Sequence, residues 1–371
     1  MRSRSLPFDK TFLWLVGGLT VFGLVMLMSA SGPLGFQTNG DSFYFLKSQL
    51  IKGILPGVTL FAILAILDYR ILRKFAFPAL IASVVLLVLV YVPGIGLHLG
   101  GSSRWISIAG ITFQPSEFVK VTFLVYVASW LASRDTADLH TLEKGLVPFL
   151  LPLCVVLLLL IKQPNTGTTT VVAAMSLACY FVTGAPLLWF GALAAAGGVG
   201  LYTLIHLTSY RAQRFMTFLH PELDPNGVGY HINQAFLAVG SGGLFGLGYG
   251  QSRQKFLYLP EVASDSIFAV MAEELGFILM VVFLIVLAAL VWRCFKIAKE
   301  APDAFGTYLA TGVGAWIAAQ SILNIGSMIG LMPITGVTLP FMSYGSSAFV
   351  GIAAACGIVA SVSRHMSSSR V

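Results

Sequence analysis

Long apolar runs separated by short polar joints fill the chain from residue 11 to residue 363. A helix needs about 20 apolar residues to cross the hydrocarbon core of a membrane. The pattern predicts ten such spans, at 11–31, 46–67, 75–95, 116–133, 146–162, 167–184, 187–207, 266–292, 305–329 and 345–363. We therefore expect an all-α polytopic membrane protein, with the whole chain, 1–371, forming one membrane domain.

Basic residues gather near the cytoplasmic ends of membrane helices. If the amino terminus lies inside, most of the 22 Lys and Arg residues fall in cytoplasmic joints. We therefore predict that both termini and the joint at 293–300 are cytoplasmic. The stretches 94–115, 208–265 and 332–347 then lie outside, and 208–265, between spans 7 and 8, is the one long exterior loop.

Composition agrees with a lipid environment, because 57% of the 371 residues are hydrophobic and only 10% are charged. The net charge of +7 is dispersed over the joints and forms no basic stripe, which argues against a nucleic-acid partner and favours contact with anionic lipid. The four cysteines have no paired spacing, so neither a disulfide framework nor a zinc site is expected.

Two charged motifs lie near the start of the fourth span. Glu117 and Lys120 are three residues apart and share one helical face. They form either a structural ion pair or a site in which Glu117 holds Lys120 toward an anionic head group, and the cost of burying charge in lipid favours the second. Arg104, beside Trp105, is either an interfacial anchor or a ligand of a substrate phosphate.

The long exterior loop carries further cations around a glycine-rich segment, residues 240–250. Arg211 and Arg214 open the loop, and Arg253 and Lys255 follow the glycines. An anionic substrate explains positive charge on the outside, and anionic lipid is the alternative. The segment itself fits a re-entrant or interfacial stretch, because irregular backbone at membrane depth must be sheltered by protein or water.

Asp265 lies at the exterior mouth of the eighth span and is the strongest candidate for chemistry. A carboxylate there is suited to general-base catalysis, whereas Ser264 or Asp265 as a helix cap is the structural alternative. Glu273 and Glu274 lie two to three turns deeper and are better placed to pair with other helices.

Several motifs in order resemble the SEDS family of shape, elongation, division and sporulation proteins, over nearly the whole chain. They are 114–117 (Gln-Pro-Ser-Glu), 163–167 (Gln-Pro-Asn-Thr-Gly), 227–230 (Gly-Val-Gly-Tyr), 259–261 (Leu-Pro-Glu) with Asp265, 272–276 (Ala-Glu-Glu-Leu-Gly) and 339–345 (Leu-Pro-Phe-Met-Ser-Tyr-Gly). Residues 248–260 look closer to the division type, FtsW, than to the elongation type, RodA.

The resemblance implies a peptidoglycan glycosyltransferase that polymerises lipid II at the outer face of the bacterial plasma membrane, for cell division. It implies a cognate class B penicillin-binding protein and other division or elongation membrane proteins as partners. Asp265 aligns with the essential acidic residue of the family, Glu117 and Lys120 with its charged pair, and Ser343 falls in a motif assigned to substrate binding. Arg104, Lys120, Arg211, Arg214 or Lys255 would meet the pyrophosphate of lipid II and of the growing glycan-lipid, with or without Mg²⁺ or Mn²⁺.

The sequence departs from the family pattern at four positions. Asn165 replaces a carboxylate, Ala263 and Ser266 replace the His and Phe that flank the acidic residue, and Ser346 replaces a Gly. The change from a carboxylate to an amide at position 165 counts against a metal or proton role there. The rival functions are a flippase for the lipid-linked precursor, the RodA-type elongation polymerase, and a scaffold that only recruits the transpeptidase.

Overall fold

The computed structural model describes residues 8–366 except 100, 101, 109, 208 and 222–226. Helices occupy each of the ten predicted spans. They are α1 (Lys10–Asn39), α2 (Tyr44–Ser48) continued by η1 (Gln49–Ile54) and α3 (Leu55–Ile66), η2 (Tyr69–Phe75) continued by α4 (Ala76–Leu89), α5 (Pro115–Ala132), η3 (Leu142–Leu146) continued by α7 (Val147–Lys162), α8 (Thr166–Val182), α9 (Leu187–Leu207), α12 (Ile267–Glu300), α13 (Ala304–Met328) and α14 (Ser346–Ser363).

Seven of the helical stretches in the described part of the chain are long and apolar enough to cross a membrane, and α8 and part of α9 are shorter apolar helices. The charges of Glu117 and Lys120 make α5 the most polar of the remaining spans. The protein is therefore an all-α polytopic membrane protein. The figure of ten crossings stays a prediction.

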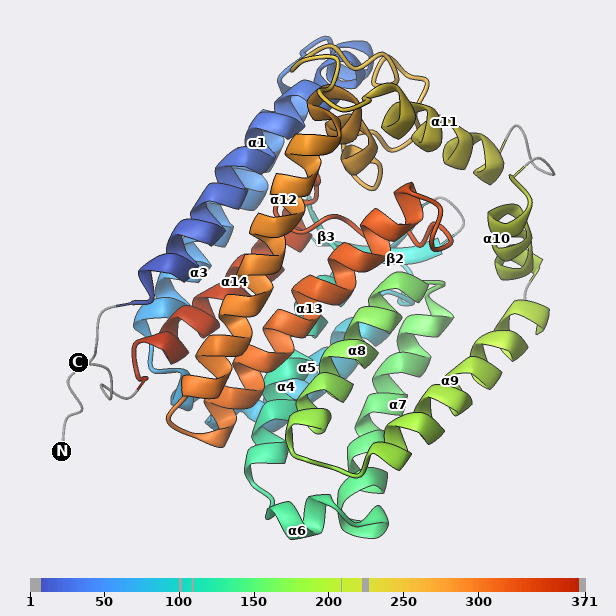
Figure 1. Cartoon of the computed structure of the whole chain (residues 1–371). Coiled ribbons are helices and arrows are strands. Elements are labelled where there is room, and N and C mark those ends of the chain that lie inside the picture. Colours follow the sequence, from blue (N-terminus) through green and yellow to red (C-terminus); the bar gives the residue numbers. More distant parts are fainter. Residues whose placement is uncertain (1–7, 100–101, 109, 208, 222–226, 367–371) are drawn as a thin grey trace.

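The helices form a bundle around α13 (Figure 1). This helix packs against α12, α8, α5 and α14, and most of its residues are buried. The two ends of the described chain and the α12–α13 joint lie at one end of the bundle, together with the short helix α6 (Thr136–Leu139). The helix α11 (Val228–Ser241) lies at the opposite end. This arrangement matches the predicted grouping of termini and joint on one side.

Two features of the connecting segments were not predicted. Residues 94–115 contain a three-stranded antiparallel sheet, made of β1 (Gly96–Leu99), β2 (Ser102–Ile108) and β3 (Ile111–Phe113). In its register Gly96 faces Ile106, which in turn faces Phe113. The long segment 208–265 is not simply a loop, because it contains α11 and the amphipathic helix α10 (Ser209–Leu219).

The helix α12 is interrupted at Gly276, where φ is 72° and ψ is 175°. The glycine-rich segment 242–248 fills the interruption with four backbone hydrogen bonds. The N–H groups of Leu247 and Gly248 donate to the carbonyls of Glu273 and Glu274 at 3.0 Å each, and Gly243 and Leu244 accept from Phe277 and Ile278 at 2.9 and 3.1 Å. The backbone groups that the break exposes are thus satisfied.

Close packing at this junction requires glycine. A Cβ added to Gly276 would lie 2.1 Å from the backbone N of Gly246, and one added to Gly246 would lie 2.2 Å from the carbonyl oxygen of Glu274. Since such distances are far below van der Waals contact, no side chain fits here. The glycine-rich segment packs closely against α12 at this junction, and its predicted position at membrane depth stays a prediction.

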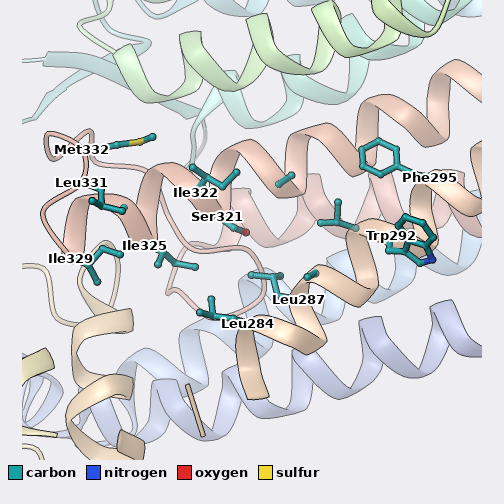
Figure 2. A pocket seen from close by; sticks show the side chains of 14 residues that line it. Leu284, Leu287, Trp292, Phe295, Ser321, Ile322, Ile325, Ile329, Leu331 and Met332 are labelled. Atoms are coloured by element: carbon teal, nitrogen blue, oxygen red, sulfur yellow. The ribbon is translucent and has the colours of Figure 1, made fainter. Parts of the chain in front are cut away.

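An apolar groove of about 490 Å³ runs between the outer faces of α12 and α13 (Figure 2). Its walls include Leu287 and Val291 on α12 and Ile322 and Ile325 on α13, with Leu331 and Met332 at one end. The lining is almost wholly aliphatic and aromatic, so the groove presents an apolar surface of the kind that lipid chains or another membrane helix would cover.

Candidate functional site

Asp265 lies in the turn immediately before α12, and its side chain is partly buried. The carboxylate of Asp265 lies close to Gly336, in the connection between α13 and α14. A Cβ added to Gly336 would lie 3.4 Å from Oδ2 of Asp265 and 4.0 Å from Nη1 of Arg104. A carboxylate and a guanidinium from distant parts of the sequence therefore border the same small volume, beside a residue that has no side chain.

The sheet and the end of α7 hold Arg104 in place. Arg104 lies on β2, and its Nε donates to the carbonyl of Gln163 at 3.1 Å while its Nη2 donates to the carbonyl of Pro164. These carbonyls follow the last turn of α7, where the helix dipole places partial negative charge. The two backbone carbonyls thus fix the guanidinium at the carboxyl end of α7.

The capping alternative for Asp265 does not match the start of α12. The N-cap residue is Ser266, whose side chain makes no capping hydrogen bond in the described structure. Its hydroxyl instead donates to the carbonyl of Pro260 at 2.8 Å and lies 2.6 Å from Nε2 of His231. Asp265 therefore lies one residue before the N-cap position of α12.

Ser343 ties the Asp265 turn to the α13–α14 connection. Its hydroxyl donates to the carbonyl of Ser264 at 2.6 Å and accepts from the N–H of Leu339 at 2.8 Å. The neighbouring N–H of Tyr344 donates to the carbonyl of Ala263 at 2.7 Å. Ser343 is only 6% exposed, so the structure gives it a supporting place behind Asp265 rather than an open one.

Lys120 is buried, with 1% of its surface exposed, and does not face a head group as expected. Its Nζ lies 2.8 Å from Oε2 of Glu117, donates to Oε1 of Gln320 at 2.9 Å and lies 4.6 Å from the ring centre of Trp316. The pair joins α5 to α13, as the ion-pair alternative proposed. Contact between Lys120 and a substrate would need a different conformation, so its binding role stays a prediction.

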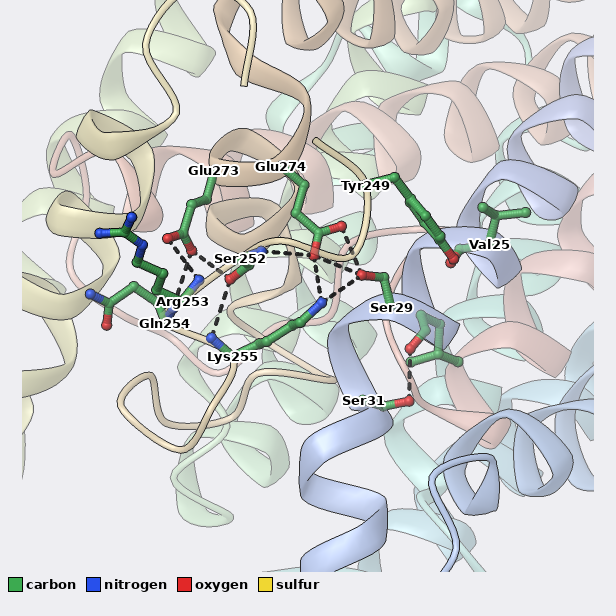
Figure 3. Close-up of polar contacts among 11 residues, drawn as sticks. Val25, Ser29, Ser31, Tyr249, Ser252, Arg253, Gln254, Lys255, Glu273 and Glu274 are labelled. Atoms are coloured by element: carbon green, nitrogen blue, oxygen red, sulfur yellow. Dashed lines mark hydrogen bonds and ion pairs between the residues drawn. The ribbon is translucent and has the colours of Figure 1, made fainter. Parts of the chain in front are cut away.

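Lys255 is also buried, at a second ion pair (Figure 3). Its Nζ lies 2.8 Å from Oε1 of Glu274 and 3.0 Å from Oγ of Ser29 on α1. Glu273 accepts from the hydroxyl of Ser252 and from the backbone N–H groups of Arg253 and Gln254. The two glutamates therefore anchor the segment after the glycines. Glu274 also reaches another helix, through Ser29 on α1, as predicted, whereas the partners of Glu273 lie in a non-helical segment. Lys255 has little surface left for a substrate.

Arg211 and Arg214 lie on α10, and their side chains are outside the described part of the structure. Of the predicted site residues, the structure thus brings Asp265 and Arg104 to one place, with Ser343 behind Asp265. It places Glu117–Lys120 and Lys255 in two separate buried pairs.

Comparison with known proteins identifies the family of the chain. The protein family described as "Cell cycle protein", which comprises FtsW, RodA and SpoVE, matches residues 10–368. The chain belongs to this family. Stage V sporulation protein E of Bacillus subtilis is 39% identical over 94% of each chain, and the probable peptidoglycan glycosyltransferase FtsW of Trichlorobacter lovleyi is 38% identical over 97% of this chain and 94% of the relative.

Solved structures of the family have the same fold. The rod shape determining protein RodA of Thermus thermophilus matches with a TM-score of 0.71 and 29% identity, over 96% of this chain and 97% of RodA. A chain from a structure titled "Structural coordination of polymerization and crosslinking by a peptidoglycan synthase complex" matches with a TM-score of 0.78 and 28% identity, covering 96% and 98%. The higher identities to FtsW and SpoVE support the predicted closeness to the division type.

Asn165, one departure from the family pattern, has a structural role here. It is the N-cap of α8, where its Oδ1 accepts from the N–H of Thr168 at 3.3 Å, and its Nδ2 donates to the hydroxyl of Ser116 at 3.2 Å. An amide does both, whereas an ionised carboxylate could only accept. Position 165 in this family member therefore joins α8 to the start of α5.

Sequence reasoning missed two amides on α13, Gln320 and Asn324. Nδ2 of Asn324 donates to the backbone carbonyls of Asp265 at 2.8 Å and of Val337 at 2.7 Å. Oε1 of Gln320 accepts a hydrogen bond from Nζ of Lys120, and its Nε2 donates to the carbonyl of Thr338. The sequence does contain a sign of their role. Two amides four residues apart in an apolar span lie on one face of the helix and need hydrogen-bond partners there.

The described residues contain no group of three or more His, Cys, Asp or Glu side chains that could hold a metal ion. The donors beside Asp265 thus do not fit a resident divalent ion held by protein ligands alone. Among the described side chains, those that border Gly336 are the carboxylate of Asp265 and the guanidinium of Arg104.

Proposed function

We propose that this protein is a peptidoglycan glycosyltransferase of the division type, which polymerises lipid II at the outer face of the bacterial plasma membrane. The observation that supports this most is the position of Asp265 and Arg104 on either side of Gly336, in a chain that matches FtsW and SpoVE relatives over almost their full length. The site lies toward the end of the bundle opposite the termini, which we place outside.

In the proposed reaction Asp265 is the general base. A sugar hydroxyl is a poor nucleophile at neutral pH, and a carboxylate within hydrogen-bond reach removes its proton as the bond forms. The 4-hydroxyl of one lipid-linked disaccharide attacks the anomeric carbon of the growing chain, and the polyprenyl pyrophosphate leaves with the bonding electrons. One displacement inverts the configuration at that carbon.

Arg104 is the cation that we assign to the departing pyrophosphate. A guanidinium matches two phosphate oxygens at once, and it is already held in place before the substrate binds, so charge that develops in the transition state meets a fixed partner. Arg211 and Arg214 remain candidates for the same role. Any Mg²⁺ or Mn²⁺ would arrive with the pyrophosphate, because the described residues contain no group of three or more His, Cys, Asp or Glu side chains that could hold it.

A class B penicillin-binding protein is the partner that we propose. The relative whose title describes a synthase complex that coordinates polymerization and crosslinking supports a partner of this kind. A membrane-anchored transpeptidase needs an apolar docking surface within the bilayer, and the groove between α12 and α13 offers one.

The deciding experiment is polymerisation of lipid II by the purified protein in proteoliposomes, with substrate supplied from one side. Asp265→Asn keeps the size of the side chain but removes the base, and we expect the rate to fall by about 10²–10⁴-fold. Glu261→Gln is the matched control, because it changes an exposed carboxylate four residues away in the same turn. This control should stay within about threefold of the parent.

Three outcomes would contradict the proposal. Long glycan chains made by Asp265→Asn at the parental rate would remove the base from the mechanism. Transfer of lipid II across the bilayer by the parent protein, without polymer, would identify a flippase. Neither polymer nor transfer, with the transpeptidase still bound, would identify a scaffold.

A further inference from the structure

A row of polar side chains runs along one face of α13 toward Asp265. Trp316, Gln320 and Asn324 are spaced by four residues, so they lie one above another on the helix. All three are at most 3% exposed. The row begins at the buried Glu117–Lys120 pair and ends at the backbone of Asp265.

Gln320 makes a full set of hydrogen bonds in this row. Its Oε1 accepts from Nζ of Lys120 at 2.9 Å and from Nε1 of Trp316 at 2.6 Å, and its Nε2 donates to the carbonyl and the hydroxyl of Thr338 at 2.9 and 3.3 Å. An amide with every donor and acceptor used has one orientation. Gln320 therefore fixes the α13–α14 connection two residues after Gly336.

Asn324 holds the other side of the same connection. Its Nδ2 donates both to the carbonyl of Val337, next to Gly336, and to the carbonyl of Asp265. One amide group thus sets the distance between the backbone of Asp265 and the backbone of Val337, next to the glycine that the Asp265 carboxylate faces. Its Oδ1 is buried without a hydrogen-bond partner in the described structure, so the hydrogen bonds of this side chain there are those that its Nδ2 donates.

We propose that Asn324 and Gln320 are positioning residues for Asp265. The inference rests on the proposed function, in which Asp265 is the general base. A base must lie within hydrogen-bond reach of the hydroxyl that it deprotonates, and a misplacement of about 1 Å can cost about 100-fold in rate. Asn324 holds Asp265 against residue 337, and Gln320 holds residue 338 against the Glu117–Lys120 pair.

The test compares Asn324→Leu, which has a similar size but no donors, with Ser327→Ala. Ser327 is a buried polar residue of the same helix. In the described structure its hydroxyl donates to the backbone carbonyl of Asn324, so Ser327→Ala leaves the Asn324 amide side chain and its two bonds in place. We expect Asn324→Leu to lower kcat by about 10–100-fold with KM for lipid II unchanged within about threefold, since it displaces a catalytic group and no binding group. Ser327→Ala should match the parent in both.

A double variant separates positioning from general damage to the fold. In the Asp265→Asn protein the base is already absent, so adding Asn324→Leu should lower the residual rate by less than about threefold. Losses that multiply in the double variant would overturn the proposal, as would parental kcat in Asn324→Leu. If Asn324→Leu does not accumulate, Asn324→Ser, which keeps one donor, should show a smaller loss of kcat with the same unchanged KM.

The two proposals fail in distinguishable ways. Full activity of Asp265→Asn would reject the assignment of the base, and with it the reason for a positioning role. Collapse of Asp265→Asn together with parental kcat in Asn324→Leu would leave the proposed function intact and reject only the role of α13. Gln320→Met, which removes the bonds to Thr338, should resemble Asn324→Leu in its unchanged KM.

Discussion

At the scale of single residues, the burial of the Glu117–Lys120 pair implies a contribution to stability. Lys120→Met would leave the buried Glu117 carboxylate without its cation, and breaking a buried pair in this way costs about 3–5 kcal/mol. We therefore expect the single variant to unfold at a clearly lower temperature in detergent, whatever its effect on polymerisation.

The double variant Glu117→Gln with Lys120→Met supplies the control, because it removes both charges and leaves no unpaired ion. It should recover most of the lost thermal stability. If Lys120→Met is instead as stable as the parent and loses only activity, the lysine serves the substrate and not the fold.

The sequence identified Asp265 as a catalytic candidate through its place at a helix mouth and its match to the acidic residue of the family. It left Arg104 as either an interfacial anchor or a phosphate ligand. It could not tell that Lys120 and Lys255 are enclosed, since burial depends on which distant helix supplies the partner. Gln320 and Glu274 supply those partners from more than a dozen residues away in sequence. Nor could the sequence place Asn324 beside Asp265, 59 residues away.

At the scale of elements, the interruption of α12 depends on a glycine. Gly276→Ala would put a side chain at φ of 72° and 2.1 Å from backbone, so we expect a loss of well over the 1–3 kcal/mol that such a backbone conformation costs by itself. Gly240→Ala is the matched control, because a Cβ there meets nothing within 4 Å. Thermal unfolding of both purified variants would test this, and equal stability would show that the junction is loosely packed.

The start of α13 carries a pH-dependent contribution. Burial alone would raise the pKa of the Asp303 carboxyl, but hydrogen bonds from the Tyr69 hydroxyl, the Gly306 N–H and the Arg70 guanidinium outweigh it and hold the pKa below 3.8. A lowered pKa in the folded state gives stability that is full above the ordinary value and is lost as the pH falls through the lowered one.

Asp303→Asn keeps an oxygen that can cap the helix but does not titrate. We expect its melting temperature to fall less than that of the parent when the pH is lowered from about 5 to about 2. Parallel curves would mean that Asp303 has the same pKa in the folded and the unfolded chain.

Most elements followed from the sequence because a long apolar run in a membrane has few alternatives to a helix. The sheet at 96–113 did not, since its strands have three to seven residues and no clear alternation. The break in α12 was also missed. Its apolar pattern continues across Gly276, and only the glycines of a separate segment explain the junction.

At the scale of the whole molecule, orientation in the membrane is the open prediction. In a Cys154→Ser background, which removes the one exposed native cysteine, Asn39→Cys and Lys299→Cys place exposed thiols at opposite ends of the bundle. With the termini inside, an impermeant thiol reagent added to intact cells should label position 39 and not position 299. The reverse labelling would invert the orientation and place Asp265 on the cytoplasmic side.

The junction between α12 and the glycine-rich segment also constrains how the chain enters the bilayer. In the described structure the carbonyls of Glu273 and Glu274 and the N–H groups of Phe277 and Ile278 are hydrogen-bonded to residues 243–248. Those residues leave the ribosome first, with unsatisfied backbone that lipid would penalise. If the segment lies within the bilayer, we expect it to stay in water or beside the insertion machinery until α12 has been synthesised, and to enter the membrane together with α12.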